Sequence, residues 1–316
     1  MTTGGFADYC VAKFDSLSSI LEMLKRTTVY GRFSAPRTMT TRRVLALPHP
    51  ASQMTLSLII AQERKNIATI IRSSPLTLYK TNLKSNRSRA FSGLNFRMRV
   101  KQETAILAQY PFVLMADIAN FFHTIYSHSI PWAVLTKEHV KEAREKKWQM
   151  LADVEKHWCS LLDTALQRGN SRETFGIPVG PDTSRIIAEI LLAGIHNDKG
   201  FRDAAAANKG YRLVDDFFIR FETEAAAGKC LDALRHVLWE YNLHLNEGKT
   251  RIVSASAVYG ESWRHELESF QFDDSTLAKQ RDSVQHLMDI TLRQCAARQD
   301  AQPASFFCRR LLGVGI

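Results

Sequence analysis

Tyr211-Arg212-Leu213-Val214-Asp215-Asp216-Phe217-Phe218-Ile219-Arg220-Phe221 is the stretch of sequence that decides the fold. Two apolar runs flank an acidic pair, and this pattern predicts a β-hairpin with both carboxylates at its turn. An ordinary hairpin turn prefers Asn-Gly or Asp-Gly. An Asp-Asp pair by itself commonly marks a solvated turn, but the apolar strands on both sides make that interpretation weaker here.

A third carboxylate ends another predicted strand. The continuous apolar run Phe112-Val113-Leu114-Met115-Ala116 begins after Pro111 and ends at Asp117, as a buried central strand does. Strand ends at one edge of a sheet can bring Asp117 close to Asp215 and Asp216. Because unpaired carboxylates raise one another's pKa, such a group favours hard divalent cations such as Mg²⁺. Two such ions would lower the pKa of an attacking hydroxyl and neutralise a departing pyrophosphate.

Helices and strands are interspersed along the rest of the chain. Apolar spacing predicts helices over 8–30, 52–71, 136–169 and 224–241. A turn is predicted at 176–180, followed by a helix capped by Thr183 with one apolar stripe. Strands are predicted at 42–47 and across 243–253, where one strand contains both 243–245 and 251–253. Residues 73–100, rich in Ser, Asn and Arg, are predicted to form loops, with a strand as the alternative for part of the segment. Helices that alternate with strands and include a hairpin indicate an α+β fold with an antiparallel sheet.

Composition excludes several classes of protein. The 316 residues are 45% hydrophobic and 23% charged, which is typical of a globular chain with a sizeable core. Apolar stretches fall far short of a membrane span, and the first eight residues lack the basic and apolar regions of a secretion signal. The five cysteines are scattered without a Cys-x-x-Cys pair. We therefore expect a cytoplasmic protein with reduced thiols and no zinc site.

The net charge of +10 is concentrated in one part of the chain. Residues 23–102 contain sixteen Lys and Arg residues and one acid, Glu63, so this window carries +15. Such an asymmetry is typical of a face that binds a polyanion, whereas a merely soluble basic surface mixes both signs. The charge pattern thus predicts a nucleic-acid partner.

Four segments resemble, in their order and intervals, the palm motifs of bacterial reverse transcriptases. They are Ala116–Phe122 with Ile125–Trp132, Gly176–Arg185, Leu213–Asp216 and Leu245–Thr250. The resemblance runs from about Arg42 to Phe272. The strings His-Ser-Ile-Pro-Trp at 128–132 and Gly-Pro-Asp-Thr-Ser-Arg at 180–185 are most similar to the abortive-infection and defence-associated group of these enzymes.

The resemblance implies a polymerase right-hand fold. Residues 1–111 would be the fingers and N-terminal basic region, and residues 112–275 the palm, with a helical fingers insertion at about 133–175. Residues 276–316 would be a short helical C-terminal region, a truncated thumb or extension. We expect the large C-terminal extension of the defence group to be missing or shortened.

The resemblance also implies roles for single residues. Asp117, Asp215 and Asp216, with the carbonyl of Ile118, would hold two Mg²⁺ ions, for which Mn²⁺ is a substitute. Lys249 would protonate the leaving pyrophosphate or stabilise its charge. Phe122 would exclude the 2′-hydroxyl of an incoming nucleotide, although a core aromatic is the alternative interpretation. Gly180 would let the backbone approach the nucleotide, and Arg89, one of several basic candidates, would grip the triphosphate.

The implied activity is RNA-directed DNA polymerisation, in which deoxynucleotides are added to a 3′-hydroxyl, in antiphage defence. Expected partners are an RNA template, an associated non-coding RNA, the DNA product and deoxynucleotides, and a protein partner or homo-oligomer stays open. Two alternatives are template-independent or protein-primed DNA synthesis, and a non-autonomous nucleic-acid-binding subunit. Leu213, in place of the usual aromatic, and Val179, in place of glutamine, keep the first alternative open, and the short C-terminus favours the second.

Overall fold

The computed structural model describes residues 26–36, 41–77, 110–146, 148–205, 210–254, 263–298 and 301–314. Its described residues form two compact units, the first within 1–32 and 45–255 and the second within 33–44 and 256–316. Strands β1 (Gly31–Pro36) and β2 (Arg42–Leu47) pair as a two-stranded sheet. The strand predicted at 42–47 is therefore confirmed.

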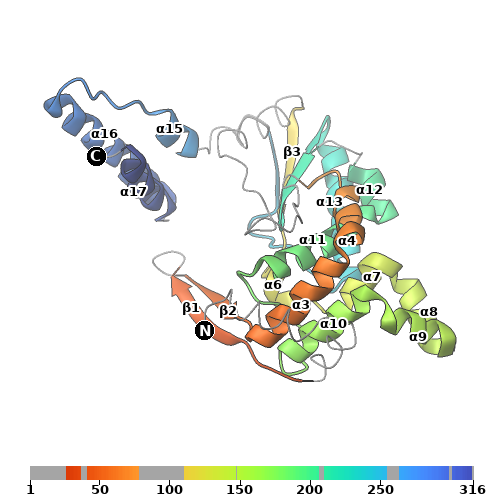
Figure 1. Ribbon diagram of the computed structural model, residues 1–316. Coiled ribbons are helices and arrows are strands. Elements are labelled where there is room, and N and C mark those ends of the chain that lie inside the picture. The colour runs from red at the N-terminus through yellow and green to blue at the C-terminus, as the bar shows by residue number, and fades with distance from the viewer. Residues whose placement is uncertain are drawn as a thin grey trace. The chain divides into compact units, whose positions relative to one another are not determined.

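A four-stranded antiparallel sheet in the first unit carries the predicted hairpin (Figure 1). Its order is β4 (Gly210–Leu213), β5 (Asp216–Phe221), β3 (Phe112–Asp117) and β6 (Arg251–Ser254). β3 is an inner strand, hydrogen-bonded to β5 on one side and β6 on the other. The predicted α+β class and the buried strand that ends at Asp117 are both confirmed.

The segment between the hairpin and β6 is a helix, as predicted. α13 (Glu224–Glu240) begins where the Thr223 hydroxyl accepts a hydrogen bond from the Ala226 amide at 3.2 Å. It packs on β3, β5 and β6, and α12 (Lys199–Ala205) packs beside it. The strand predicted across 243–253 is split, because Leu245 makes an isolated bridge to Ile118 and only β6 is a regular strand.

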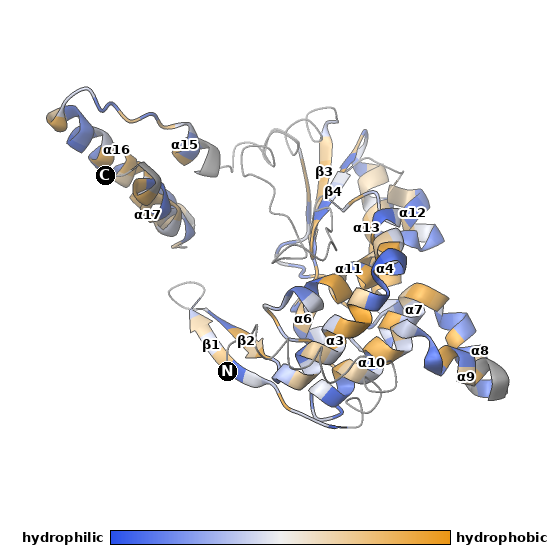
Figure 2. Ribbon diagram, in the orientation of Figure 1, coloured by the Kyte–Doolittle hydropathy of each residue, from blue (hydrophilic) through white to orange (hydrophobic). Residues whose placement is uncertain are grey.

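α11 (Asp182–Asn197) is the most buried helix of the first unit. It contacts α3 (Pro50–Gln62), α4 (Arg64–Ser73), α7 (Ser129–Leu135) and α12, so every residue from 183 to 196 except Arg185 is buried. The predicted apolar stripe is buried, but the opposite side of α11 is buried as well, which a one-sided stripe does not predict. The visible part of α11 is largely hydrophobic in Figure 2. Thr183 does not cap this helix, because Pro181 occupies the cap position and the Thr183 hydroxyl donates to the Gln53 side chain at 3.2 Å.

Two predicted long helices are broken. The helix expected over 52–71 is α3 and α4, which meet at Glu63. The helix expected over 136–169 is α8 (Lys137–Lys146), α9 (Trp148–Lys156) and α10 (Trp158–Gly169). His157 has an extended backbone, and its ring accepts from the Cys159 amide at the start of α10. Apolar periodicity predicted one helix because a single non-helical residue hardly disturbs that periodicity.

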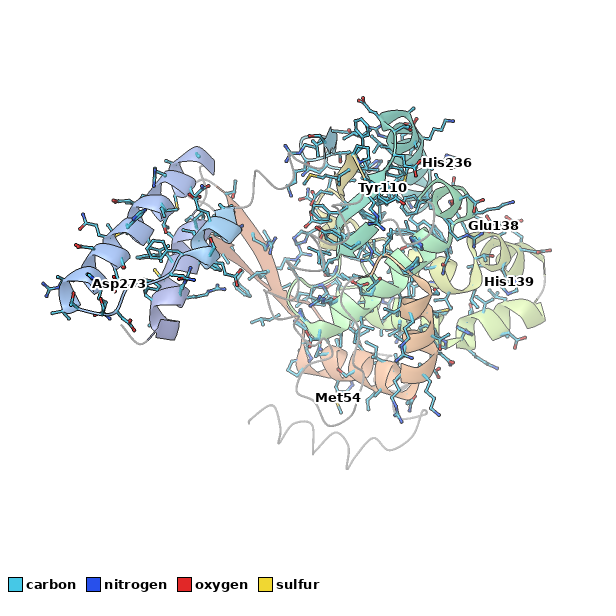
Figure 3. The ribbon with its side chains drawn as sticks, turned by 90° about the horizontal axis from the view of Figure 1, so that it is seen from above. Met54, Tyr110, Glu138, His139, His236 and Asp273 are labelled. Carbon is cyan, nitrogen blue, oxygen red and sulfur yellow. The ribbon has the colours of Figure 1, made fainter. Side chains whose placement is uncertain are left out.

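α8 and α9 form a helical pair with a small core of their own. Val140 and Ala143 of α8 are buried with Val154 of α9. Glu138 and His139, which precede Val140, are exposed (Figure 3). The charged face that the sequence shows here is therefore solvated, and its apolar face holds the pair together.

The remaining predictions are settled only in part. Residues 26–30 are not helical, so the end of the helix expected over 8–30 is wrong, while residues 8–25 and 78–100 lie outside the described residues. The second unit contains α15 (Trp263–Ser269), α16 (Leu277–Arg298) and α17 (Gln302–Val314), around a core of Trp263, Leu267, Leu287 and Ile290. Within the described part of the chain, no helix has the length and apolar character needed to cross a membrane.

Candidate active site

Three carboxylates meet at one edge of the four-stranded sheet. Asp117 is the last residue of β3, and it lies opposite Asp216, the first residue of β5, in the antiparallel register. Asp215 is in the turn before β5, and its carbonyl accepts a hydrogen bond from the Ile118 amide at 3.3 Å. The structure thus brings together the three acids that the sequence singled out, although about a hundred residues separate them along the chain.

The turn that carries Asp215 is strained. Leu213 pairs with Asp216, so only Val214 and Asp215 connect β4 to β5. Val214 has a φ of 58°, a left-handed conformation that β-branched residues rarely adopt. Strain of this kind persists only where surrounding contacts enforce it, and it is common at functional sites.

Lys249 lies directly on the first of these carboxylates. Its ammonium donates to both oxygens of Asp117, at 3.1 and 3.2 Å. A backbone turn after Leu245 sets this position, because the Asn246 amide donates to the Asp117 carbonyl at 2.7 Å. The Asp117 side chain is 9% exposed and that of Lys249 is 49% exposed, so a solvent-accessible cation covers a buried anion.

The arrangement of the three carboxylates changes the pKa of Asp216 most clearly. Burial raises the pKa of Asp216 to about 7, and the Asp215 charge, a hydrogen bond with Asp117 and the Asp117 charge act in the same direction. The Lys249 charge opposes the shift. Near neutral pH this carboxyl group therefore holds its proton part of the time, unless further positive charge arrives.

A second loop approaches the site behind Asp117. Asn120 has a φ of 48° and precedes the short helix α6 (Phe121–Thr124). Phe121 is 2% exposed, and Phe122 is half-buried, with its ring edge-on to that of Phe121. The Phe122 carbonyl accepts from the Ile177 amide at 2.8 Å, which ties α6 to the loop that contains Gly180.

Gly180 has open space beside its backbone among the described residues. Its φ of 130° disfavours any residue with a side chain, and a β-carbon built on it would meet no described atom within 4 Å. Space beside the backbone is what the approach of a ligand requires. Its contact with a nucleotide stays a prediction.

The family described as reverse transcriptase (RNA-dependent DNA polymerase) matches residues 56–292, which is more than half of the chain and includes all three acids and Lys249. This chain belongs to the reverse transcriptase family.

Solved structures similar to this reverse transcriptase include telomerases from Candida tropicalis. The apo form has a TM-score of 0.46 and 13% identity, over 73% of this chain and 45% of that one. A form truncated from the C-terminal domain has a TM-score of 0.43 and 15% identity, over 74% of this chain and 53% of that one. The complex with a TWJ fragment of telomeric RNA has a TM-score of 0.41 and 13% identity, over 72% of this chain and 41% of that one. The chain thus spans about half the length of these telomerases, and no curated protein matches it.

Reverse transcriptases use divalent metal ions, and the acids of this reverse transcriptase suit them chemically. Among the described residues, no three His, Cys, Asp or Glu side chains are grouped as ready metal ligands. Burial, and after it the charges of Asp215 and Asp117, nevertheless raise the pKa of Asp216, although Lys249 lies on Asp117. Such a donor set fits a divalent cation that completes the site when it binds.

Of the two remaining predicted site residues of this reverse transcriptase, one lies among the described residues and one does not. Ile118 is buried beside Asp117 and its amide reaches the Asp215 carbonyl, but the metal-ligand role of its own carbonyl stays a prediction. Arg89 lies outside the described residues.

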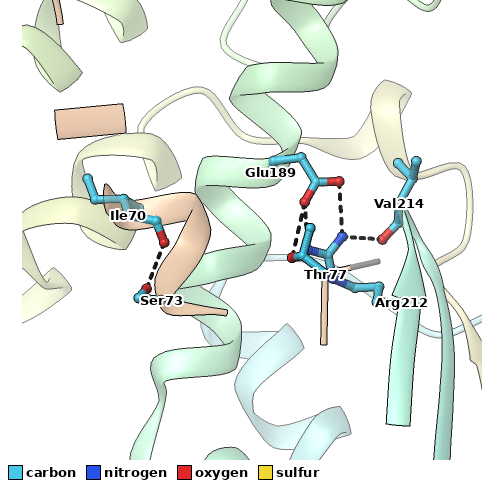
Figure 4. Close-up of polar contacts among 6 residues, drawn as sticks. All are labelled: Ile70, Ser73, Thr77, Glu189, Arg212 and Val214. Carbon is cyan, nitrogen blue, oxygen red and sulfur yellow. Dashed lines mark hydrogen bonds and ion pairs between the residues drawn. The ribbon is translucent and has the colours of Figure 1, made fainter. Parts of the chain in front are cut away.

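Sequence reasoning missed a buried ion pair next to the acidic turn. Arg212, immediately before Leu213, binds Glu189 in the middle of α11 (Figure 4). A signal for it was present, because a lone arginine in a buried strand and a lone glutamate in an apolar helix each require an opposite charge. Neither residue lies within the motifs that resemble reverse transcriptases, because Glu189 follows Gly176–Arg185 by four residues and Arg212 precedes Leu213–Asp216 by one.

Proposed function

We propose that this chain is an RNA-directed DNA polymerase that adds deoxynucleotides to a 3′-hydroxyl by two-metal catalysis with Mg²⁺. The observation that carries the proposal is the pairing of Asp117 with Asp216 across β3 and β5, with Asp215 in the adjoining turn. Membership of the reverse transcriptase family supports it. In this proposal the three acids hold the ions, assisted by the Ile118 carbonyl.

Bound divalent ions supply two kinds of chemistry, since they lower the pKa of the attacking hydroxyl and neutralise charge on the departing pyrophosphate. The chain's own residues supply the rest. Asp216, whose pKa is raised, would give up its proton to solvent in the ion-bound site and so become a charged ligand. Lys249 then leaves Asp117, and its ammonium donates a proton or a hydrogen bond to the pyrophosphate. The exposure of its side chain supports such a movement.

Three further residues recognise the substrate in this proposal. Phe122 stands against the ribose and excludes its 2′-hydroxyl, Gly180 admits the nucleotide to the backbone, and Arg89 binds the triphosphate. The space beside Gly180 and the partial exposure of Phe122 support the first two assignments. Residues 1–111 act as fingers, 112–275 as palm with the insertion at about 133–175, and 276–316 as a short C-terminal region.

The biological setting is proposed from sequence resemblance alone. The strings at 128–132 and 180–185 support a role in cytoplasmic antiphage defence, with an associated non-coding RNA as template and DNA as product. Phage plating on cells that carry the wild type or an Asp215→Ala variant tests this role. Equal plaque formation on both would contradict it.

Primer extension tests the polymerase assignment. The purified chain is given an oligo(dT) primer with labelled dTTP and Mg²⁺, with and without poly(rA). We expect extension only on the template, and we expect Asp117→Ala and Asp215→Ala to abolish it because each removes a metal ligand. Asp232→Ala on α13, whose side chain is 78% exposed, is the matched control and should extend normally.

The same experiment separates the alternatives. Extension without poly(rA) would support template-independent synthesis instead. Nucleic-acid binding without any extension would indicate a subunit that needs a partner. Wild-type extension by both aspartate variants, with circular dichroism of a folded protein, would refute the assignment of the acids.

A further inference from the structure

Arg212 and Glu189 form an ion pair that is almost completely withdrawn from water. Each side chain is 1% exposed. The two guanidinium Nη atoms of Arg212 donate to the two carboxylate oxygens of Glu189, at 3.3 Å for Nη1 and 2.7 Å for Nη2 (Figure 4). The fork-shaped contact fixes the plane of the guanidinium relative to α11.

The same guanidinium also contacts two other segments. Nη1 donates to the Val214 carbonyl at 2.7 Å, and Nη2 donates to the Thr77 hydroxyl at 2.8 Å. The Thr77 hydroxyl lies 3.5 Å from Glu189, and the Arg212 amide donates to the Leu76 carbonyl at 2.6 Å. Arg212 therefore joins the acidic turn, α11 and the segment after α4 in one network.

The contact with Val214 is the informative one. Val214 is the residue with the left-handed φ, and its carbonyl belongs to the peptide bond that leads into Asp215. A hydrogen bond from a charged donor is stronger than one between neutral groups. The donation from Arg212 therefore stabilises one orientation of this peptide, although the valine side chain disfavours the conformation.

A purely structural role does not explain the pair well. Burial of two charges costs free energy that their attraction hardly returns, and hydrophobic replacement of a buried pair is often neutral or stabilising. Arg212 Nε adds to that cost, because it has no hydrogen-bond partner among the described residues. Specific positioning of a neighbouring group is a benefit that such a replacement would lose.

We propose that Arg212 is a positioning residue, which holds the Val214–Asp215 peptide so that Asp215 and Asp216 face Asp117, with Glu189 and Thr77 fixing its guanidinium. This inference deepens the polymerase proposal and rests on it. It assigns a role in nucleotide addition to Arg212, Glu189 and Thr77, which are not among the three catalytic acids.

The test is a double variant that removes both charges together. Arg212→Met with Glu189→Met leaves no unpaired buried charge, so we expect it to fold and to unfold at a temperature near that of the wild type. It lacks the donor to Val214, and misplacement of reacting groups costs up to about 100-fold in rate. We therefore expect kcat to fall by ~10–100-fold, with the KM for the primer–template unchanged.

A matched control separates positioning from lost stability. Leu162→Ala removes a fully buried side chain from α10, a helix that packs on α3, α7 and α9. It should lower the unfolding temperature and leave kcat close to that of the wild type when assayed below that temperature. The double variant should instead keep an unfolding temperature close to that of the wild type and have a lower kcat. A wild-type kcat in the double variant would overturn the proposal.

Val214→Gly supplies a rescue. Glycine adopts a positive φ without strain. Adding Val214→Gly to the double variant should therefore restore part of the kcat that the double variant lost. Val214→Gly in the otherwise wild-type chain is the reference for this comparison. Failure to restore any activity would overturn the proposed role of the Val214 contact. If the double variant does not fold, Arg212→Lys is used in its place, because an ammonium cannot reproduce the fork of contacts. Reduced kcat rescued by Val214→Gly then supports the proposal, and an unchanged kcat overturns it.

Failure of the polymerase proposal is visible separately, as absence of extension by the wild type. The positioning is then measured by hydrogen exchange of the peptide that covers residues 210–221. Each variant is measured the same number of degrees below its own unfolding temperature. Faster exchange of this peptide in the double variant than in Leu162→Ala supports a turn held by Arg212. Equal exchange overturns it.

Discussion

At the scale of single residues, Phe121 and Phe122 show how neighbouring side chains divide between core and site. Phe121 is buried and Phe122 is only partly so. We predict that Phe122→Val keeps deoxynucleotide addition measurable and raises ribonucleotide incorporation, because a smaller side chain admits the 2′-hydroxyl. The ratio of kcat/KM values for dTTP and UTP should change by about 100-fold or more.

Phe121→Ala is the companion to this variant. It should lower the free energy of unfolding by roughly 3–5 kcal/mol, as the truncation of a buried aromatic does, and leave the ratio for the two sugars unchanged. Urea denaturation and the same kinetic assay measure both quantities. If Phe121→Ala changes sugar choice while Phe122→Val unfolds the protein, the two roles are reversed.

His196 predicts how stability depends on pH. It is 2% exposed, and neither ring nitrogen has a hydrogen-bond partner among the described residues. Burial, with the charges of Arg212 and Arg202, lowers the pKa of His196 from 6.5 to about 4. The folded state therefore resists protonation, so its stability is full above pH 6.5 and falls as the pH drops toward 4.

Calorimetry of the wild type and His196→Leu between pH 4 and pH 7.5 checks this prediction. The variant should lose less stability than the wild type over the range from pH 6.5 to pH 4, since the leucine has no proton to bind. Parallel curves for the two proteins would show that His196 does not contribute to acid sensitivity.

At the scale of elements, two glycines give opposite predictions for the same substitution. A β-carbon on Gly194 of α11 would lie 2.5 Å from the Ala133 β-carbon and 2.7 Å from its α-carbon, so α7 would have to move. Gly194→Ala should therefore destabilise the protein by about 1–3 kcal/mol. The added β-carbon of Gly228→Ala on α13 meets no atom of the described residues within 4 Å, so this change should stabilise the protein by up to about 1 kcal/mol. Thermal unfolding of both variants checks these predictions. Equal shifts of the unfolding temperature from that of the wild type would contradict the close packing of α11 on α7.

Strands were easier to predict than helix ends. The apolar run that ends at Asp117 and the hairpin around Asp215 each carry their signal within a few residues, and β3, β4 and β5 follow it. The breaks at Glu63 and His157 interrupt one residue of an otherwise helical pattern, so periodicity alone does not locate them. The all-round burial of α11 depends on four other helices, which no local window contains.

The site shows the same division. Asp117, Asp215 and Lys249 were identified because they sit in recognisable motifs, and they lie together in the structure. Arg212 and Glu189 were missed because their pairing joins a strand to a helix twenty-three residues earlier in the chain. Two buried opposite charges in the sequence imply a pair, but only the fold shows which acidic turn that pair supports.

At the scale of the whole molecule, the basic window predicts how nucleic-acid binding depends on salt. Changing Arg87, Arg89, Arg97, Arg99 and Lys101 to glutamine should weaken binding and reduce the log–log slope against salt by about 0.7–0.9 for each lost phosphate contact. A control changes five exposed basic residues outside the window: Lys199, Arg202, Lys229, Arg281 and Arg293. Fluorescence anisotropy with a labelled RNA–DNA duplex measures both. Equal slopes for the two variants would show that the window is not the binding face.

The pairing of β3 with β5 also has a consequence for folding kinetics. β4 and β5 are joined by two residues and can form a hairpin within microseconds. Asp117 reaches Asp216 only after a loop of about a hundred residues closes, and contacts of such long range slow the folding of a chain. During synthesis, the acids therefore cannot meet until the ribosome has released β5, and partly folded chains should be inert. On refolding from denaturant, extension activity should return in the slowest phase, together with the long-range pairing and later than the local hairpin.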